Sequence, residues 1–379
     1  MSSTRDFTGR LLWGMCLLAV SLAACVPTSA FPSTPSETMT SSLVPTATHT
    51  PTSAPSATPT SRTPPALPIP YQNNDLTPFG SPHTYVQDQC QYLQDKWSST
   101  NSAAGTVVMV IMFHSIVGGN TSNPNQISEF ELRTLMNKLH DEGFTAINTT
   151  QMAAFMEHNG KIPDRSVLLV VDDRHNAQYF DLFFRKYWTE YGWPVVNAWI
   201  SAFGGTDPAL AGNVALSEEE WVDYQAHGDS SPHIAIDPNS TDEFVRHDLQ
   251  GSMDNIQKYF GKAPIAYIWP GGGFTPHAVQ VARQLGYRLG FTTNPRGPVM
   301  FNWVPLVDKQ EAERPTWIPE GPVNDPLMVL PRYWDSDAII HISDVTQVGQ
   351  EASAYAEQNK AIELEYYDIV CAAQYGPIP

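Results

Sequence analysis

The chain has few basic residues and few cysteines. Its 379 residues include 21 Lys and Arg against 39 Asp and Glu, which gives a formal net charge of −18. This shortage of positive charge argues against nucleic acids and anionic lipid headgroups as partners of the protein. Beyond the first 25 residues the only cysteines are Cys90 and Cys371, near the two ends of the remaining chain. A disulfide between them is expected in an oxidising compartment, and two separate buried thiols are the alternative.

A long hydrophobic run is also missing. The apolar stretch LLWGMCLLAVSLA follows Arg5 and Arg10 and is too short and too early for a stable membrane span. It ends in LAAC, which resembles a bacterial lipoprotein signal and implies a signal peptide over residues 1–24, with a lipid on Cys25. The alternative is an ordinary secretory signal with an incidental Cys25. The lipoprotein interpretation predicts a protein anchored by its lipid to the extracellular face of the cell membrane.

Residues 25–70 have almost nothing with which to form a core. Pro, Thr, Ser and Ala dominate this tract, so an extended, disordered linker is expected. Residues 71–379 are the expected folded domain, with enough aromatic side chains for a core and for surfaces that stack on sugars.

Apolar runs alternate with amphipathic stretches from residue 106 onward. Strands are predicted at 106–116, 144–148, 166–173, 194–201, 265–272, 289–293 and 327–333. Helices are predicted at 127–143, 149–160, 176–191, 240–261 and 276–286, and a Ser-x-x-Glu pattern predicts another at 216–225. Such an alternation predicts an α/β fold with parallel strands, as an open sheet or a barrel.

Polar and aromatic residues follow several of these strands. In a parallel fold they would gather at one rim, at the carboxyl ends of the strands. The group consists of His114, Asp172, Asp173, His227, Trp269, Pro270, Gly271 and Arg332. Two adjacent carboxylates are costly to bury unless they are paired or bind a cation, although Asp at a strand end also caps helices.

The order of four motifs resembles the polysaccharide deacetylases, carbohydrate esterase family 4. They are FHSI at 113–116, VLLVVDD at 167–173, AHGDSSPH at 226–233 and WPGGG at 269–273. The Trp-Pro segment is similar to the exopolysaccharide-deacetylase branch, in which it replaces an arginine motif. The resemblance covers about 105–345 and implies a distorted (β/α) barrel.

The resemblance also implies roles for individual residues. Asp172 would be the general base, and Asp173 and His227 would be metal ligands. The family's second histidine ligand is Ser231 here, so His233 is expected to replace it, with His175 as another possible substitute. A divalent cation is implied, zinc first, with cobalt, nickel or manganese as alternatives.

Other family positions match less closely. Arg174 stands where the family has glycine, and the arginine of the family's third motif is absent. Arg332 is expected to orient Asp172 in its place. His341, in AIIHIS, is expected to be the general acid. The expected substrate contacts are His114, Trp269, Pro270 and Gly271.

The resemblance implies a metal-dependent hydrolase that removes N-acetyl groups from a polysaccharide. A protein that kept the fold, lost the metal and only binds polysaccharide is the second hypothesis. A glycosidase is a third, but a second carboxylate across a groove from Asp172 is not evident.

Overall fold

A curled parallel sheet organises the part of the chain that the computed structural model describes, which is residues 62–73, 80–312, 314 and 317–379. The strand order is β10-β9-β8-β7-β6-β2-β12, and β5 pairs with the same edge of β6 as β7 does. The strands are β2 (Val107–Phe113), β5 (Thr145–Ala146), β6 (Arg165–Val171), β7 (Val195–Trp199), β8 (Val222–Ala226), β9 (Ala266–Ile268), β10 (Leu289–Phe291) and β12 (Tyr333–Trp334). Their pairings are all parallel, as predicted. The expected signal peptide, Cys25 and most of the linker lie outside the described residues.

One short segment joins the two edges of the sheet. Leu330 forms a parallel bridge with Phe291 of β10, and three residues later β12 pairs with β2. The chain between these two points therefore closes the curl of the sheet. Arg332 lies within this closing segment. The distorted barrel expected from the sequence is confirmed.

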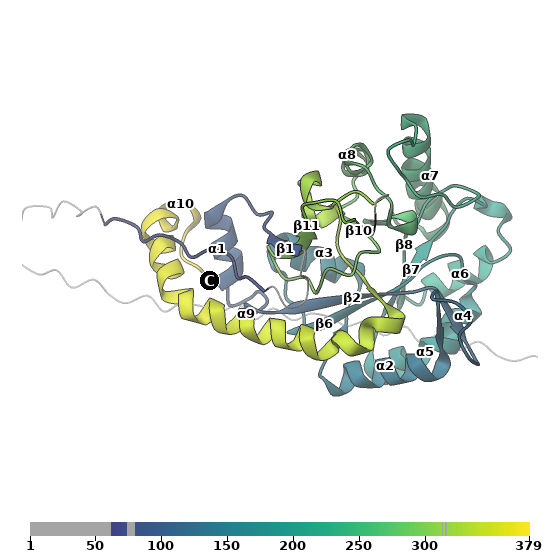
Figure 1. Cartoon of the computed structure of the whole chain (residues 1–379), viewed down its shortest axis with the longest axis horizontal. Coiled ribbons are helices and arrows are strands. Elements are labelled where there is room, and N and C mark those ends of the chain that lie inside the picture. The colour runs from purple at the N-terminus through teal and green to yellow at the C-terminus, as the bar shows by residue number, and fades with distance from the viewer. Residues whose placement is uncertain (1–61, 74–79, 313, 315–316) are drawn as a thin grey trace, which may run out of the picture. The chain divides into compact units, whose positions relative to one another are not determined.

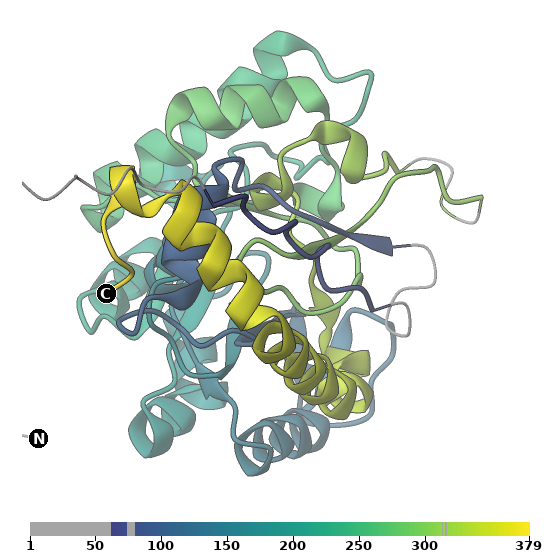
Figure 2. The same ribbon diagram turned by 90° about the vertical axis from the view of Figure 1, so that its left-hand side faces the viewer.

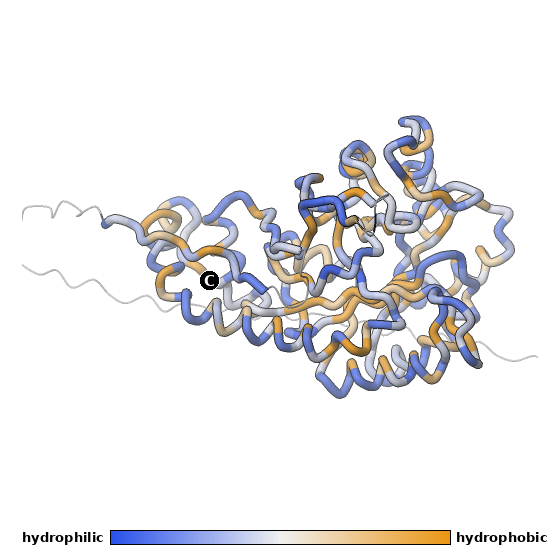
Figure 3. The backbone as a smooth tube through the Cα atoms, in the orientation of Figure 1, coloured by the Kyte–Doolittle hydropathy of each residue, from blue (hydrophilic) through white to orange (hydrophobic). Residues whose placement is uncertain are grey.

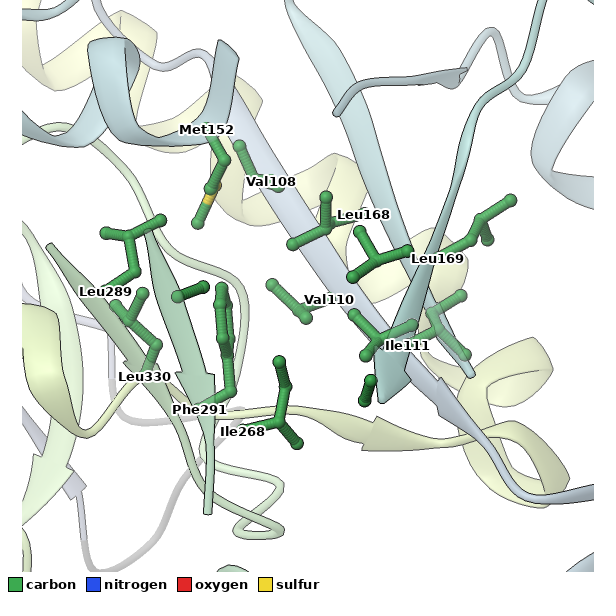
Figure 4. Packing of buried hydrophobic residues seen from close by; sticks show 14 of the residues in the cluster. Val108, Val110, Ile111, Met152, Leu168, Leu169, Ile268, Leu289, Phe291 and Leu330 are labelled. Atoms are coloured by element: carbon green, nitrogen blue, oxygen red, sulfur yellow. The ribbon is translucent and has the colours of Figure 1, made fainter. Parts of the chain in front are cut away.

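The interior of the barrel is apolar. Val110 of β2 lies opposite Leu168 of β6. Because successive side chains of a strand point to opposite faces, every second residue of each strand faces the interior with them. Figure 4 shows Val110, Leu168, Ile268 and Phe291 converging from strands on opposite sides. Because helices cover the outer face as well, the strands are buried on both sides and are almost continuously hydrophobic (Figure 3).

Helices surround the sheet at most of the predicted places. They are α2 (Glu129–Asp141), α3 (Thr149–His158), α4 (Ala177–Phe183), α5 (Arg185–Tyr191), α6 (Leu210–Ser217), α7 (Asp242–Phe260) and α8 (Pro276–Leu285). The helix predicted at 176–191 is two helices that meet at Phe184. The helix predicted at 216–225 is wrong, since α6 ends at Ser217 and β8 follows. Burial of every β8 residue outweighs the local capping pattern.

Smaller elements and one long helix complete the fold. They are β1 (Gly80–His83) with β11 (Val304–Val307), β3 (Ser115–Val117) with β4 (Gln126–Ser128), α1 (Gln89–Trp97), α9 (Asp335–Val370) and α10 (Ala372–Tyr375). The sequence analysis did not identify α9. This helix runs from the carboxyl end of β2 back along the sheet to α1 (Figures 1 and 2). No helix among the described residues is both long and apolar enough to span a bilayer.

A disulfide joins Cys90 of α1 to Cys371 at the end of α9, which confirms the expected pairing. It closes a loop of 281 residues and fixes the amino- and carboxyl-terminal parts of the domain to each other. The cross-link therefore limits the freedom of nearly the whole unfolded domain.

Replacing both cysteines by serine is expected to lower the free energy of unfolding by about 2–5 kcal/mol, because the unfolded chain gains the freedom that the cross-link removes. Denaturant unfolding of the two proteins measures the difference. Dithiothreitol should destabilise the parent protein and leave the double variant unchanged. Equal sensitivity of both proteins would contradict the assignment.

Candidate active site

A buried ion pair joins the end of β6 to the segment that closes the barrel. Arg332 donates from Nη1 to Oδ1 of Asp172 at 2.6 Å and from Nη2 to Oδ2 at 2.9 Å. Its Nε donates to the carbonyl of Thr292 at 2.7 Å. The two side chains are 0 % and 2 % exposed. Three directed hydrogen bonds thus hold the guanidinium, and the guanidinium holds the carboxylate.

Asp172 stays ionised despite its burial. Burial acts to raise the pKa of its carboxyl group, but the charges of Arg332, His227 and His114 outweigh it and lower the pKa to about 2. At neutral pH the site therefore contains a fixed, oriented carboxylate. Arg332 lies where it can orient Asp172, and this role stays a prediction.

His227 follows β8 with its ring oriented by the backbone. Its Nδ1 lies 2.8 Å from the carbonyl of Ile268 on the neighbouring strand. Because a carbonyl only accepts, Nδ1 carries the proton and Nε2 keeps its lone pair. Burial lowers the pKa of His227 to about 4, so the imidazole is neutral at pH 7. A neutral imidazole with one nitrogen held by a carbonyl is the usual arrangement of a metal ligand.

Asp173 leaves the strand in a left-handed conformation, with φ of 71°. Regular alternation would turn its side chain away from that of Asp172. The left-handed turn instead brings a carboxylate oxygen to 3.9 Å from Nε2 of His227. A non-glycine residue in this region costs free energy, and such strain concentrates at functional sites.

His233 approaches Asp173 and His227 from the loop after β8. Its Nε2 donates to the carbonyl of His227 at 2.8 Å, which leaves the lone pair on Nδ1. One ligand atom each from Asp173, His227 and His233 can be chosen so that all lie within 4.8 Å of one another. Two imidazoles and one carboxylate match the donor set of zinc and similar divalent cations. The side chains therefore fit the expected cation. Ser231, at the family's ligand position, is exposed.

His114 and Trp334 lie on the other side of Asp172. Nε2 of His114 is 3.8 Å from Oδ2 of Asp172, and its ring stacks on Trp334 with centroids 5.3 Å apart. The His114 side chain is 14 % exposed, so it is within reach of a ligand. Trp334 was not among the residues expected at the site, and its position two residues after Arg332 was the available signal.

Arg174 makes contacts that the family's glycine could not. It forms an ion pair with the buried carboxylate of Asp207, and its guanidinium carbon lies 4.5 Å from the ring centroid of Phe203. Asp207 was not identified from the sequence, because no local pattern marks it. The ring of His175 stacks on Tyr179 with centroids 3.9 Å apart. His175 is not one of the residues that converge with Asp173.

The WPGGG segment is only partly as expected. Trp269 is completely buried and donates from Nε1 to the carbonyl of Met328, so the substrate contact expected of its side chain is wrong. It occupies the strand face opposite the site, where Tyr267 packs on it. Gly271 is exposed and lines a cleft, whereas Pro270 is buried. The described contacts of His341 are with Asp344 and Tyr333, and its role as the acid stays a prediction.

A family model matches the middle part of the chain. The model described as "Polysaccharide deacetylase" matches residues 159–290, a segment that contains Asp172, Asp173, His227 and His233. The Bacillus subtilis (strain 168) protein YxkH, which bears the provisional name of a polysaccharide deacetylase, is 24% identical over 203 residues. That match covers 52% of this chain and 68% of YxkH.

Three solved structures resemble this chain, each with a TM-score below 0.5. A de-N-acetylase from Aggregatibacter actinomycetemcomitans has a TM-score of 0.49 and 17% identity, covering 63% of this chain and 99% of that one. The Streptococcus pyogenes deacetylase PplD has a TM-score of 0.47 and 18% identity, covering 60% and 92%. IcaB from Ammonifex degensii has a TM-score of 0.46 and 14% identity, covering 67% and 100%.

Replacing Arg332 by Met is expected to lower the free energy of unfolding at pH 7 by about 3–5 kcal/mol, because Asp172 is left buried without its partner. The double variant Arg332→Met with Asp172→Leu should recover most of this loss. Denaturant unfolding of the four proteins in the cycle measures the coupling. Additive losses would show that the pair contributes nothing.

The same ion pair predicts a pH dependence. The pKa of Asp172 is lowered from 3.8 to about 2 on folding, so its stabilising contribution is complete above pH 4 and is lost as the pH falls towards 2. The difference in unfolding free energy between the parent and Arg332→Met should shrink as the pH falls from 6 to 3, because the buried, unpaired carboxyl group of the variant takes up a proton before that of the parent does. Unfolding curves from pH 6 to pH 3 test this, and a constant difference would contradict it.

Proposed function

We propose, from the match of residues 159–290 to the polysaccharide deacetylase model, that the protein hydrolyses N-acetyl groups of an extracellular or cell-wall polysaccharide with the help of a divalent cation. One observation carries the proposal. Asp173, His227 and His233 converge close to an oriented, ionised Asp172, as hydrolysis of an amide requires.

The proposed cation is zinc, with cobalt, nickel or manganese able to replace it. Asp173 Oδ1, His227 Nε2 and His233 Nδ1 would hold it. When bound, such a cation polarises the acetyl carbonyl and activates water. Three protein ligands leave coordination positions open for these groups.

Asp172 is the proposed base, and Arg332 keeps it ionised and oriented. The fork of Arg332 directs both carboxylate oxygens, so the carboxylate cannot rotate away from the site. His114 is the imidazole closest to Asp172 on the side of Trp334. We assign to it, ahead of His341, the donation of a proton to the departing amine.

The location remains a proposal from the sequence. Cys25 would carry the lipid, residues 25–70 would act as a tether, and the domain would act at the extracellular face of the cell membrane. The net charge of −18 favours a neutral polysaccharide over nucleic acid as the partner.

Binding of polysaccharide without catalysis is the second candidate, and one feature favours it. Arg332 engages both oxygens of Asp172, so the base is fully occupied in this arrangement. Turnover of an N-acetylglucosamine oligomer separates the two candidates.

Loss of a ligand is expected to weaken cation binding by about 100-fold or more, since even loss of a supporting partner costs about 10–100-fold. The changes are Asp173→Asn, His227→Ala and His233→Ala. His247→Ala is the matched control, because this exposed histidine lies outside the group. Calorimetric titration with zinc and release of acetate from an N-acetylglucosamine tetramer are the two measurements.

The expected result is that all three ligand variants lose zinc and acetate release together, while the control keeps both. Unchanged zinc binding in His233→Ala would remove this residue from the site. Acetate release that persists in Asp173→Asn would overturn the proposed mechanism.

A further inference from the structure

The loop after β7, residues 200–209, contributes no side chain to the candidate cation site but is bonded on both sides of it. Strand β7 lies between β6 and β8 in the sheet. Asp173 follows β6, and His227 follows β8. This segment, called the β7 loop below, therefore leaves the sheet between the two strand ends that carry these ligands.

One side of the β7 loop is bonded to Arg174, the residue directly after Asp173. Arg174 donates from Nε to Oδ2 of Asp207 at 2.5 Å and from Nη2 to Oδ1. The Asp207 side chain is 2% exposed, and its Oδ1 also accepts from the backbone N–H of Ala209 at 2.8 Å. Phe203, in the same loop, lies under the guanidinium. Two directed bonds to a buried carboxylate fix the planar guanidinium in one position.

The other side of the β7 loop is bonded to the residues directly after His227. The backbone N–H of Ser201 donates to the carbonyl of Gly228 at 3.0 Å, and its Oγ donates to Oδ1 of Asp229 at 2.8 Å. The backbone N–H of Asp229 donates in turn to Asp248 at 2.8 Å. The start of the loop is therefore attached to a segment that is itself held in place.

A buried amide on α6 adds a second connection between the two strand ends. Asn213 donates from Nδ2 to the carbonyl of His175 at 3.1 Å, and its Oδ1 accepts from the hydroxyl of Tyr224 on β8 at 2.7 Å. The Asn213 side chain is completely buried. Because both ends of the amide are bonded, it has one orientation, and the segment after Asp173 is held relative to β8.

Asp173 needs such support from its neighbours. Its side chain is 50% exposed, so its own packing does not fix its position. Its backbone adopts the left-handed conformation, with φ of 71°. A strained conformation of this kind persists only where the surrounding structure holds it. The bonds of Arg174 and His175, the next two residues, supply that restraint.

We infer that Arg174, Asp207 and Ser201 are positioning residues of the cation site. Through the β7 loop they hold Asp173 and His227 at the separation at which both can bind one cation. Arg174 stands where the family has glycine, so a turn that glycine leaves free is held here by an ion pair. The inference rests on the proposed function for the cation.

The test compares two double variants. Arg174→Met with Asp207→Asn removes the ion pair without leaving an unpaired buried charge, and Asn keeps an acceptor for the Ala209 N–H. Arg283→Met with Asp325→Asn is the matched control. That arginine also donates from Nε and Nη2 to one carboxylate, at 2.7 Å each, and is 33% exposed against 29% for Arg174.

Two single variants complete the set. Ser201→Ala breaks the side-chain bond on the other side of the β7 loop. Arg174→Lys keeps the positive charge but cannot form the two-pronged contact, so it should retain part of the affinity. The measurements are calorimetric titration with zinc, the visible spectrum of the cobalt-loaded protein, denaturant unfolding, and acetate release from an N-acetylglucosamine tetramer.

The Arg174 and Asp207 double variant is expected to bind zinc about tenfold more weakly, at the lower end of the roughly 10–100-fold that loss of a supporting partner costs. Its cobalt spectrum should change, because the ligands no longer hold one geometry, while its unfolding free energy changes little. Ser201→Ala should weaken zinc binding in the same direction, and the control should bind as the parent does. Unchanged zinc affinity in the double variant, or an equal loss in the control, would overturn the inference.

The inference and the proposed function can fail separately. Zinc binding that depends on Arg174 in a protein that releases no acetate would leave the positioning role standing and refute the deacetylase. Acetate release by the parent, with zinc affinity unchanged in the double variant, would refute the positioning role alone. A parent protein that binds no zinc would refute both.

Discussion

The buried ion pair between Asp172 and Arg332 is the constraint on which the site depends. A carboxylate buried on the inner face of the barrel is unfavourable without a partner, and the partner comes from the segment that closes the curled sheet. The segment that closes the barrel therefore also carries the residue that orients the proposed base. The pair also separates two groups of residues. His114 and Trp334 lie on one side, and Asp173, His227 and His233 form the other.

Much of the fold could be predicted from the sequence, because buried parallel strands and amphipathic helices have distinct periodicities. The Val- and Leu-rich runs that became β2 and β6 are clear examples. The exceptions have physical causes. The Ser-x-x-Glu pattern at Ser217 is local, and it could not reveal that the next residues are buried as β8. The 36-residue helix α9 alternates short apolar and polar groups, with no strong amphipathic pattern to mark it.

The candidate site was predictable where a residue lies at a strand end and less so where the fold must supply the partner. Asp172, Asp173 and His227 belong to the first kind. The approach of His233 depends on the path of a loop, and the pairing of Arg174 with Asp207 depends on a contact 33 residues away. Trp269 shows the opposite failure. Its motif suggested a substrate contact, but its side chain is buried on the outer face of the sheet. A one-residue difference in strand alternation decides between these two positions.

In the proposed site His233 replaces the family's second histidine, so that one carboxylate and two imidazoles bind the cation. X-ray absorption spectroscopy of the zinc-loaded protein tests this most directly, because imidazole rings give a distinct scattering signature. The predicted results are two imidazoles per zinc in the parent and one in His233→Ala, with the variant loaded at a zinc concentration high enough to overcome its weakened affinity. A single imidazole in the parent, or two in His233→Ala, would contradict the account.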